Sequence, residues 1–420
     1  MKVYIATFGC RANQYDSEAA KALLVAGGAE IVDSPGEADA ALFNSCAVTS
    51  RAEADLRASI RRAARANPAL HTVVMGCASA LDAGRDASRS LRSLPTVESV
   101  LAGADLEGVA RSLDIDPELA LERPSLQSGA RALLRIQDGC DEHCTFCATT
   151  LARGANRSRP IAELVSEAAR LGERHSEIVI TGVHIGTYGA DLGTSLSQLI
   201  EQLVRAAPRA RFRLSSVEAT EVDDRLRERL TAGDGGLVPY LHAPLQSGSD
   251  RLLKRMGRHW YSAASYAAAI ERIVRGVSVF GLGADIIAGF PGETEEDHQA
   301  TMELVESLPF TGLHVFPYSA RPGTAAERLG AQLPAREISR RAREVRELGE
   351  RKADAYHRAR DGGAAEVVII GSAGLRDGLT EDYIRVRSTD ESIARGTRVS
   401  ALLEYRAGAV FARPASSARS

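Results

Sequence analysis

Three cysteines within eight residues place the strongest constraint on this chain of 420 residues. Cys140, Cys144 and Cys147 have the spacing C-x3-C-x2-C and directly follow the apolar run 132–136. Three thiolates on one short loop can bind three irons of a [4Fe–4S] cube and leave the fourth iron open to another ligand. A structural zinc site needs four ligands, and His143 is the available fourth, but it lies inside the loop with poor reach. The spacing therefore favours an iron–sulfur cluster over zinc.

Apolar runs that alternate with helical segments predict two α/β regions. Within 1–115, buried parallel strands are expected at 3–8, 40–43 and 72–75, with helices over 16–26 and 51–66. A polar segment, 114–129, is expected to be a linker. Six further apolar runs then alternate with helices, at 132–136, 178–181, 212–214, 237–241, 283–287 and 312–316. Six βα units predict an open or partial (β/α)6 barrel, in which the strand C-termini carry the site.

The last part of the chain changes character. The segment 333–360 is charged and amphipathic and predicts a long helix. Between 366 and 412, short β-type runs separated by Gly and Asp predict a small all-β barrel. The expected fold is α/β in three domains: a Rossmann-like parallel sheet over 1–115, the partial barrel over 126–360 and the small β barrel over 361–420.

The other three cysteines each stand at the end of a predicted strand of the first domain. Cys10, Cys46 and Cys77 follow the apolar runs 3–8, 40–43 and 72–75. Because the carboxyl ends of parallel strands meet at one edge of a sheet, these thiols are expected to converge. Cysteine is often simply buried, but core cysteines belong inside strands and not at three strand ends. A second iron–sulfur cluster is the favoured interpretation.

Composition limits the remaining possibilities. No apolar run reaches the about 18 residues of a membrane helix, and the N-terminus enters a strand-like run and not a signal peptide. A cytoplasmic location away from the membrane is expected, where spaced cysteines favour metal binding over disulfides. A net charge of −3 gives no general sign of nucleic-acid binding. Candidate RNA contacts in the last domain are Arg385, Arg387, Arg398, Tyr405 and Arg406, for which solvated strand faces are an equal alternative.

The central cysteines, with an aromatic residue before the last one, resemble those of the radical S-adenosylmethionine superfamily, and the partial barrel fits its fold. The resemblance implies that S-adenosylmethionine binds the open iron and is cleaved to a 5′-deoxyadenosyl radical. It also implies cofactor contacts at the strand ends. These candidates are Phe146, Gly182, His184, Ser216, Glu218, Gln246 and Ile286.

The whole pattern resembles the methylthiotransferases, which join a three-cysteine N-terminal domain, a radical S-adenosylmethionine barrel and a small β domain called TRAM. The segments that carry the resemblance are 9–15, 44–49, 140–147, 244–250, 289–294 and 316–319. It implies two [4Fe–4S] clusters, one on Cys10, Cys46 and Cys77 and one on the central cysteines. It further implies S-adenosylmethionine as cofactor, a flavodoxin- or ferredoxin-like electron donor and a source of sulfur.

Three branches of that family differ in substrate. The segments 13–18, 181–189 and 215–218 are similar to the branch that modifies carbon 2 of N6-threonylcarbamoyladenosine at position 37 of tRNA. The resemblance then implies the tRNA anticodon stem-loop as partner. The alternatives are isopentenyladenosine in tRNA, an aspartate of a ribosomal protein or, outside the enzymes, a zinc-stabilised RNA-binding protein. The segment 148–152 lacks the two aliphatic residues and the proline that commonly precede the pair Arg153-Gly154, which affects the substrate entrance and not the cluster ligands.

Overall fold

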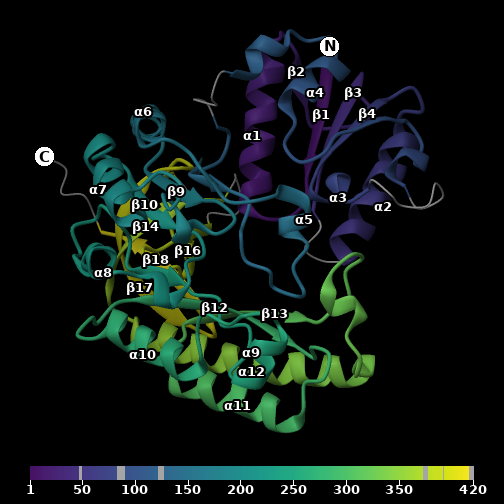
Figure 1. Ribbon diagram of the computed structural model, residues 1–420. Coiled ribbons are helices and arrows are strands. Elements are labelled where there is room, and N and C mark those ends of the chain that lie inside the picture. The colour runs from purple at the N-terminus through teal and green to yellow at the C-terminus, as the bar shows by residue number, and fades with distance from the viewer. Residues whose placement is uncertain (47–49, 83–89, 122–126, 372–376, 391, 416–420) are drawn as a thin grey trace, which may run out of the picture.

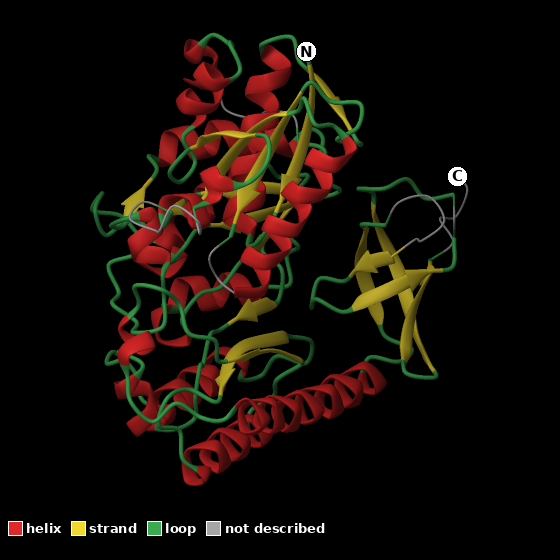
Figure 2. Ribbon diagram, turned by 90° about the vertical axis from the view of Figure 1, so that its right-hand side faces the viewer, coloured by secondary structure: helices red, strands yellow, loops and turns green. Residues whose placement is uncertain are grey.

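A computed structural model describes residues 1–46, 50–82, 90–121, 127–371, 377–390 and 392–415. It contains an N-terminal parallel sheet with helices, a central open α/β barrel and a C-terminal closed β barrel (Figure 1), which confirms the expected fold class. Figure 2 shows the long helix α12 (Ala335–Ala359) running along the lower edge of the molecule toward the C-terminal barrel. The domain limits expected from the sequence stay predictions.

The N-terminal sheet has five parallel strands in the order β2-β1-β3-β4-β5. Helices cover both of its faces, so the central strand is buried along its whole length. Leu42 packs in the core beneath α1 and α4, and its neighbour Phe43 packs beneath α2. The elements are β1 (Lys2–Thr7), α1 (Arg11–Ala26), β2 (Glu30–Val32), β3 (Ala40–Ser45), α2 (Ser50–Ala66), β4 (His71–Gly76), α3 (Cys77–Ala80), β5 (Val97–Val100) and α4 (Leu106–Ser112).

The central barrel has the six expected parallel strands, in the order β6-β9-β10-β11-β12-β13. They form two three-stranded sheets that isolated bridges join between β10 and β11, one of them between Ser216 and His242. The strands are β6 (Ala132–Arg135), β9 (Glu177–Thr181), β10 (Arg211–Leu214), β11 (Tyr240–His242), β12 (Gly281–Ala288) and β13 (Gly312–Pro317), with a short pair, β7 (Gln137–Asp138) and β8 (Arg157–Ser158). The helices are α5 (Thr149–Arg153), α6 (Ile161–Gly172), α7 (Leu196–Ala206), α8 (Asp224–Thr231), α9 (Asp250–Arg255), α10 (Ala263–Val274) and α11 (Glu295–Ser307).

The C-terminal barrel closes in the order β14-β15-β16-β18-β17 around a small apolar core. Its strands are β14 (Ala364–Ile369), β15 (Asp377–Leu379), β16 (Arg385–Ser388), β17 (Arg398–Arg406) and β18 (Ala409–Pro414). Strand β16 begins at Arg385, two residues after Tyr383. Tyr383 has a left-handed backbone conformation, with φ of 72°, and therefore cannot continue a strand.

Buried charges dock this barrel against the central one. Glu177 of β9 is fully buried and accepts hydrogen bonds from Arg211 Nε at 2.7 Å and Arg213 Nε at 2.9 Å. The same two guanidinium groups donate to backbone carbonyls of the C-terminal barrel, Arg211 to Leu379 at 3.1 Å and Arg213 to Thr380 at 2.8 Å. Since one buried carboxylate orients both arginines, the loop that carries Tyr383 is held against the wall of the central barrel.

Candidate active site

The central cysteine loop lies between β7 and α5, at the carboxyl end of the barrel strands. Each of its three sulfurs receives a hydrogen bond from outside the cysteine set. The donors are the Glu142 amide to Cys140 at 3.4 Å, Arg258 Nη1 to Cys144 at 3.5 Å and the Thr149 amide to Cys147 at 3.3 Å. Burial raises the pKa of Cys144 to about 12, against the opposing charge of Arg258. Donors aimed at all three sulfurs suit thiolates, the form that binds iron.

Arg258 joins this loop to the end of β10. Its guanidinium pairs with Glu218 Oε1 and donates from Nε to the Tyr261 hydroxyl at 2.9 Å. Glu218 is buried, and its second oxygen, Oε2, has no hydrogen-bond partner among the residues that the structure describes. A buried carboxylate oxygen without a donor is unfavourable, so this atom fits an amine or hydroxyl of a ligand. Glu218 was predicted from the sequence, but Arg258 was not, because it lies after α9 and belongs to no recognisable motif.

His184 also contacts the cysteine loop. Its Nδ1 is 3.7 Å from Cys140 Sγ, and its Nε2 is 2.8 Å from Glu221 Oε1. Burial lowers the pKa of His184, but the contacts with Cys140 and Glu221 outweigh it and raise the pKa to about 10. Gly182 packs on Gln137, whose Oε1 would be 2.9 Å from an added Cβ. The glycine thus permits close packing of the backbone behind His184.

The other predicted cofactor residues lie at neighbouring strand ends. Ser216 follows β10 and Gln246 follows β11, where it pairs with Ile286 of β12. Gln246 has a left-handed backbone, with φ of 65°, a strained state that is common at functional sites. Phe146 makes an edge contact with Phe290, with the ring centroids 6.4 Å apart. The structure brings all seven candidates to one end of the barrel, and their contact with a cofactor stays a prediction.

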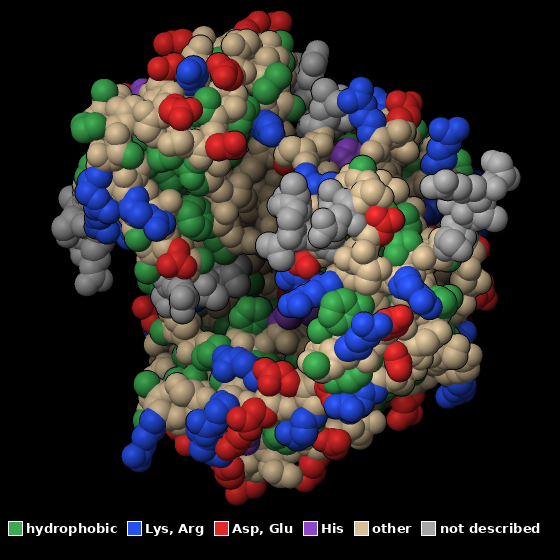
Figure 3. Space-filling model, turned by 180° about the vertical axis from the view of Figure 1, so that it is seen from behind, with side chains coloured by type: hydrophobic (Ala, Val, Ile, Leu, Met, Phe, Trp, Pro, Cys, Tyr) green, Lys and Arg blue, Asp and Glu red, His purple; other side chains and the backbone are tan. Residues whose placement is uncertain are grey.

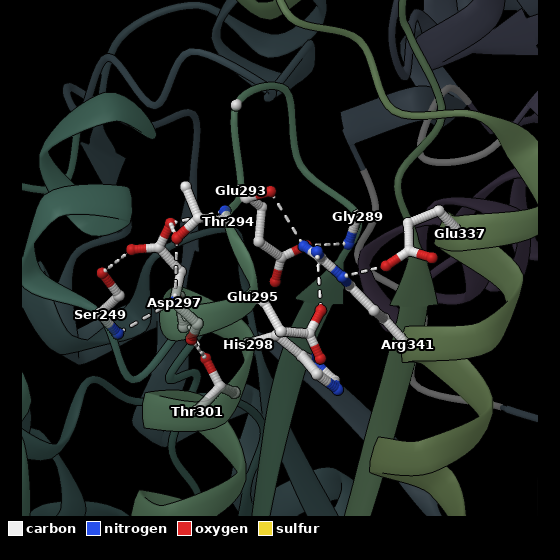
Figure 4. Close-up of polar contacts among 12 residues, drawn as sticks. Ser249, Gly289, Glu293, Thr294, Glu295, Asp297, His298, Thr301, Glu337 and Arg341 are labelled. Carbon is white, nitrogen blue, oxygen red and sulfur yellow. Dashed lines mark hydrogen bonds and ion pairs between the residues drawn. The ribbon is translucent and has the colours of Figure 1, made fainter.

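A polar network fixes the loops after β11 and β12 (Figure 4). Asp297 of α11 accepts hydrogen bonds from the Ser249 hydroxyl at 2.5 Å and from the Thr294 amide at 2.8 Å. Arg341 of α12 donates to the carbonyl of Glu293 at 3.0 Å, and Figure 4 shows the Glu293 carboxylate turned toward the same arginine. These contacts tie the strand-end loops to the helices behind them and so preorganise the site.

Cys10, Cys46 and Cys77 meet at the edge of the N-terminal sheet that faces the barrel. Asn13 Oδ1 is 3.5 Å from Cys10 Sγ and 3.9 Å from Cys77 Sγ. An added Cβ on Gly9, with φ of 108°, would lie 2.6 Å from Cys46 Sγ, so only glycine fits here. Burial raises the pKa of Cys77 to about 11. The predicted convergence of these three residues is present in the structure.

Arg153, the last residue of α5, connects the two sets of cysteines. It stands six residues after Cys147, and its Nε donates to Cys77 Sγ at 3.3 Å. Its other nitrogens donate to Asp16 Oδ2 at 2.7 Å and to Asp138 Oδ1 at 3.0 Å. The sequence marked Arg153 only as part of an Arg-Gly pair, because no local pattern reveals a contact with residues so distant in the chain.

A cavity of about 460 Å³ separates the N-terminal cysteines from the barrel strands. This volume is within the range of about 300–1,000 Å³ that is usual for ligand pockets. All three parts of the chain line it. The lining residues are Gly9, Cys10, Arg11, Cys46, Ala52, Val179, Arg213, Leu214, Ser215, Ser216, Tyr240, His242, Asp285, His314, Phe316 and Tyr383.

The candidate RNA contacts of the C-terminal barrel are mostly paired with carboxylates. Arg385 lies 2.9 Å from Asp377, Arg398 lies 3.9 Å from Glu366, Arg406 pairs with Glu404, and Tyr405 donates to Asp354. Basic and acidic side chains are also interspersed over the face shown in Figure 3. Exposed ion pairs contribute under about 1 kcal/mol and exchange readily, so RNA binding by this barrel stays a prediction. No helix in the described part of the chain is long and apolar enough to span a membrane.

Comparison with known proteins relates both cysteine regions to families. Residues 2–100 match the model of the Uncharacterized protein family UPF0004, and residues 134–305 match the Radical SAM superfamily. The chain is 31% identical over 405 residues to the threonylcarbamoyladenosine tRNA methylthiotransferase MtaB of Aquifex aeolicus, which covers 92% of this chain and 96% of the relative. It is 37% identical over 344 residues to a tRNA-2-methylthio-N(6)-dimethylallyladenosine synthase of Cereibacter sphaeroides, with 77% of each chain covered.

One solved structure shares the fold over most of the chain. The radical S-adenosylmethionine methyltransferase TsrM of Kitasatospora setae aligns with a TM-score of 0.58 over 78% of this chain and 75% of its own. Sequence identity is 14%, so this likeness concerns the fold alone.

Proposed function

Because the chain belongs to the radical S-adenosylmethionine methylthiotransferases, we propose that it adds a methylthio group to carbon 2 of N6-threonylcarbamoyladenosine at position 37 of tRNA. Membership of this family makes the chain a transferase that uses a [4Fe–4S] cluster and S-adenosylmethionine. The nature of the adenosine, the second cluster and the partners belong to the proposal.

Cys140, Cys144 and Cys147 hold the first cluster, which when bound supplies the electron that cleaves S-adenosylmethionine to a 5′-deoxyadenosyl radical. Donors on all three sulfurs support this assignment. Arg258 keeps Cys144 and Glu218 in one arrangement, and Glu218 Oε2, which has no partner among the described residues, would accept a hydrogen bond from the bound cofactor.

Cys10, Cys46 and Cys77 hold the second cluster, which when bound supplies the sulfur. Carbon 2 of adenine carries a hydrogen that is barely acidic, so a positioned base alone could not activate it. The single observation that carries the proposed function is the cavity. Cys10 and Cys46 line it together with residues of the barrel strands and of the loop after β10, so one base in this space can contact both the N-terminal cysteines and the barrel.

The cavity also supports the choice of substrate. Arg11 and His314 line it, so its wall suits a substituent that carries a carboxylate better than an apolar dimethylallyl chain. The relatives named MtaB, of which the one from Bacillus subtilis is 31% identical over 424 residues, point the same way. Dimethylallyladenosine in tRNA is the second candidate, because relatives named for it reach 37% identity over shorter alignments.

The proposed partners follow from the reaction. A flavodoxin- or ferredoxin-like protein reduces the first cluster, and a separate source replaces the sulfur that each turnover consumes. The C-terminal barrel binds the tRNA anticodon stem-loop, and the reaction takes place in the cytoplasm, where tRNA is found.

To test the proposal, the protein is reconstituted with iron and sulfide under anaerobic conditions. It is then assayed on tRNA that carries either threonylcarbamoyladenosine or dimethylallyladenosine. Mass spectrometry of the nucleosides is expected to show methylthio product on threonylcarbamoyladenosine. Replacing Cys140, Cys144 and Cys147 together by Ala abolishes 5′-deoxyadenosine formation, whereas the same change at Cys10, Cys46 and Cys77 leaves that cleavage and removes only the methylthio product.

Other outcomes separate the rivals. Product only on dimethylallyladenosine overturns the choice of substrate, and a methylthio mark on a ribosomal peptide, with none on tRNA, overturns the tRNA assignment. Colourless protein that contains zinc instead of iron supports the non-enzymatic alternative.

A further inference from the structure

Three polar side chains lie in a row on the barrel wall of the cavity. His242, Asp285 and His314 come from the adjacent strands β11, β12 and β13. His242 Nε2 is 2.9 Å from Asp285 Oδ1, and His314 Nδ1 is 3.4 Å from the same oxygen. The two imidazole rings lie 4.8 Å apart. One carboxylate oxygen therefore orients both rings.

The two histidines differ in what they offer to a ligand. His242 is buried, and its Nδ1 lies 3.3 Å from the Tyr240 hydroxyl, so both of its nitrogens are engaged. The side chain of His314 is 62% exposed, and its contact with Asp285 leaves Nε2 without a hydrogen-bond partner among the described residues. His314 Nε2 is thus the one ring nitrogen of the row that a ligand can reach.

The charges of the row make His314 a donor. Burial works against the charged form of Asp285, but the two histidines hold the pKa of this carboxyl well below its usual range. The hydrogen bond to Asp285 in turn raises the pKa of His314. With Nδ1 bound to Asp285, protonated His314 presents an Nε2–H group to the cavity, into which the guanidinium of Arg11 also faces.

The ligand atoms of the three side chains lie within 4.8 Å of one another, a spacing that a metal ion also accepts. The single carboxylate oxygen Oδ1 lies within hydrogen-bond distance of both rings, so Asp285 can orient the two histidines without an ion.

We infer that His314, oriented by Asp285, recognises the carboxylate of the amino-acid substituent on N6 of the substrate adenine and so determines specificity. The inference rests on the proposed function. On adenine, carbon 2 and the N6-bearing carbon flank the same ring nitrogen. A base whose carbon 2 faces Cys10 and Cys46 therefore turns its N6 substituent toward a neighbouring side of the ring, and His314 lines the same cavity as these cysteines.

The test compares two anticodon stem-loops, one with threonylcarbamoyladenosine and one with dimethylallyladenosine, as competing substrates of the reconstituted enzyme. Replacing His314→Leu removes the donor and keeps an apolar side chain of similar size. It is expected to lower kcat/KM on threonylcarbamoyladenosine roughly 10- to 100-fold, as for the loss of a hydrogen bond to a charged group, while the rate on dimethylallyladenosine is kept or increased. His314→Gln, which retains a donor, is expected to recover most of the loss.

His71→Leu is the matched control, because it makes the same change at a partly exposed histidine that also pairs with a carboxylate, Glu98, and His71 does not line the cavity. It should leave the ratio between the two substrates within about twofold of the wild type, far from the effect of a lost hydrogen bond. Fluorescence anisotropy measures the affinity for each of the two stem-loops and gives a second readout. In this assay, His314→Leu should bind the threonylcarbamoyl form no more tightly than the dimethylallyl form.

The outcomes distinguish the inference from its premise. Wild-type enzyme that forms no product on threonylcarbamoyladenosine refutes the proposed function. If the wild type forms this product but His314→Leu leaves the ratio of kcat/KM between the two substrates unchanged, or lowers kcat/KM equally on both, then only the role of His314 is refuted and the proposed function stands.

Discussion

Tyr383 of the C-terminal barrel stacks on Tyr240 of β11, with the ring centroids 4.3 Å apart and an angle of 19° between the rings. Arg11, next to the cluster residue Cys10, donates to the Tyr383 hydroxyl at 3.2 Å. The left-handed backbone of Tyr383 costs a non-glycine residue about 1–3 kcal/mol. Such strain persists only where surrounding contacts impose it, and here the contacts make the C-terminal barrel a wall of the cavity.

Replacing Tyr383→Ala is therefore expected to impair the reaction more than tRNA binding. Opening this wall admits water and loosens the base, so methylthio product per 5′-deoxyadenosine should fall roughly 10-fold or more. Tyr383→Phe, which keeps the stacking and loses the contact with Arg11, should fall between this variant and the wild type. Product and 5′-deoxyadenosine are counted in one assay, and tRNA affinity is measured separately. If Tyr383→Ala formed as much methylthio product per 5′-deoxyadenosine as the wild type, this wall of the cavity would have no part in the reaction.

Arg153 is expected to be essential for assembly around Cys77. Arg153→Met removes the donor to Cys77 and one of the two guanidinium groups that pair with buried Asp16, which keeps Arg135, so a cost of about 1–3 kcal/mol is expected. Urea unfolding of the metal-free protein measures this loss, and iron content after reconstitution should fall as well. Arg174→Met, the same change at an exposed position, is the control. Equal stability of the two variants would contradict the prediction.

Glu177 is expected to make docking of the C-terminal barrel dependent on pH. Burial opposes its charge, but Arg213 and Arg211 hold its pKa well below the ordinary range. Since the folded-state pKa is lowered, the stabilisation is complete above the unfolded-state pKa of about 4.3 and is lost as the pH falls below it. Glu177→Gln should thus be destabilised at pH 7, by about 3–5 kcal/mol, and approach the wild type in acid.

Urea unfolding at several pH values, together with limited proteolysis between α12 and β14, checks this dependence. The exposed Glu173→Gln is the control. A difference between Glu177→Gln and the wild type that is constant from pH 7 to pH 3 would rule out the buried carboxylate as its cause.

Much of the fold could be predicted because long apolar runs determine buried parallel strands. The six barrel strands and the three cysteine-bearing strand ends follow from such runs. The strands β2, β5 and β15 were missed, since three or four residues at a sheet edge or in a small barrel carry little periodic signal. In the site, spacing identified the cysteines, but it did not reveal Arg153, Arg258 or Tyr383, whose contacts join segments far apart in the chain.

The last prediction concerns the outer face of the C-terminal barrel. Arg385 and Arg387 are exposed on β16, on the opposite side from the buried Val386. If this face binds phosphates, changing both arginines to Gln should weaken tRNA binding. A plot of the logarithm of the tRNA association constant against the logarithm of the salt concentration should become less steep, its slope falling by about 1–2, because fewer counterions are released. Arg343→Gln on the exposed side of α12 should leave the slope unchanged. An unaltered slope in the double variant would leave the barrel its role as a cavity wall and assign tRNA binding to another surface.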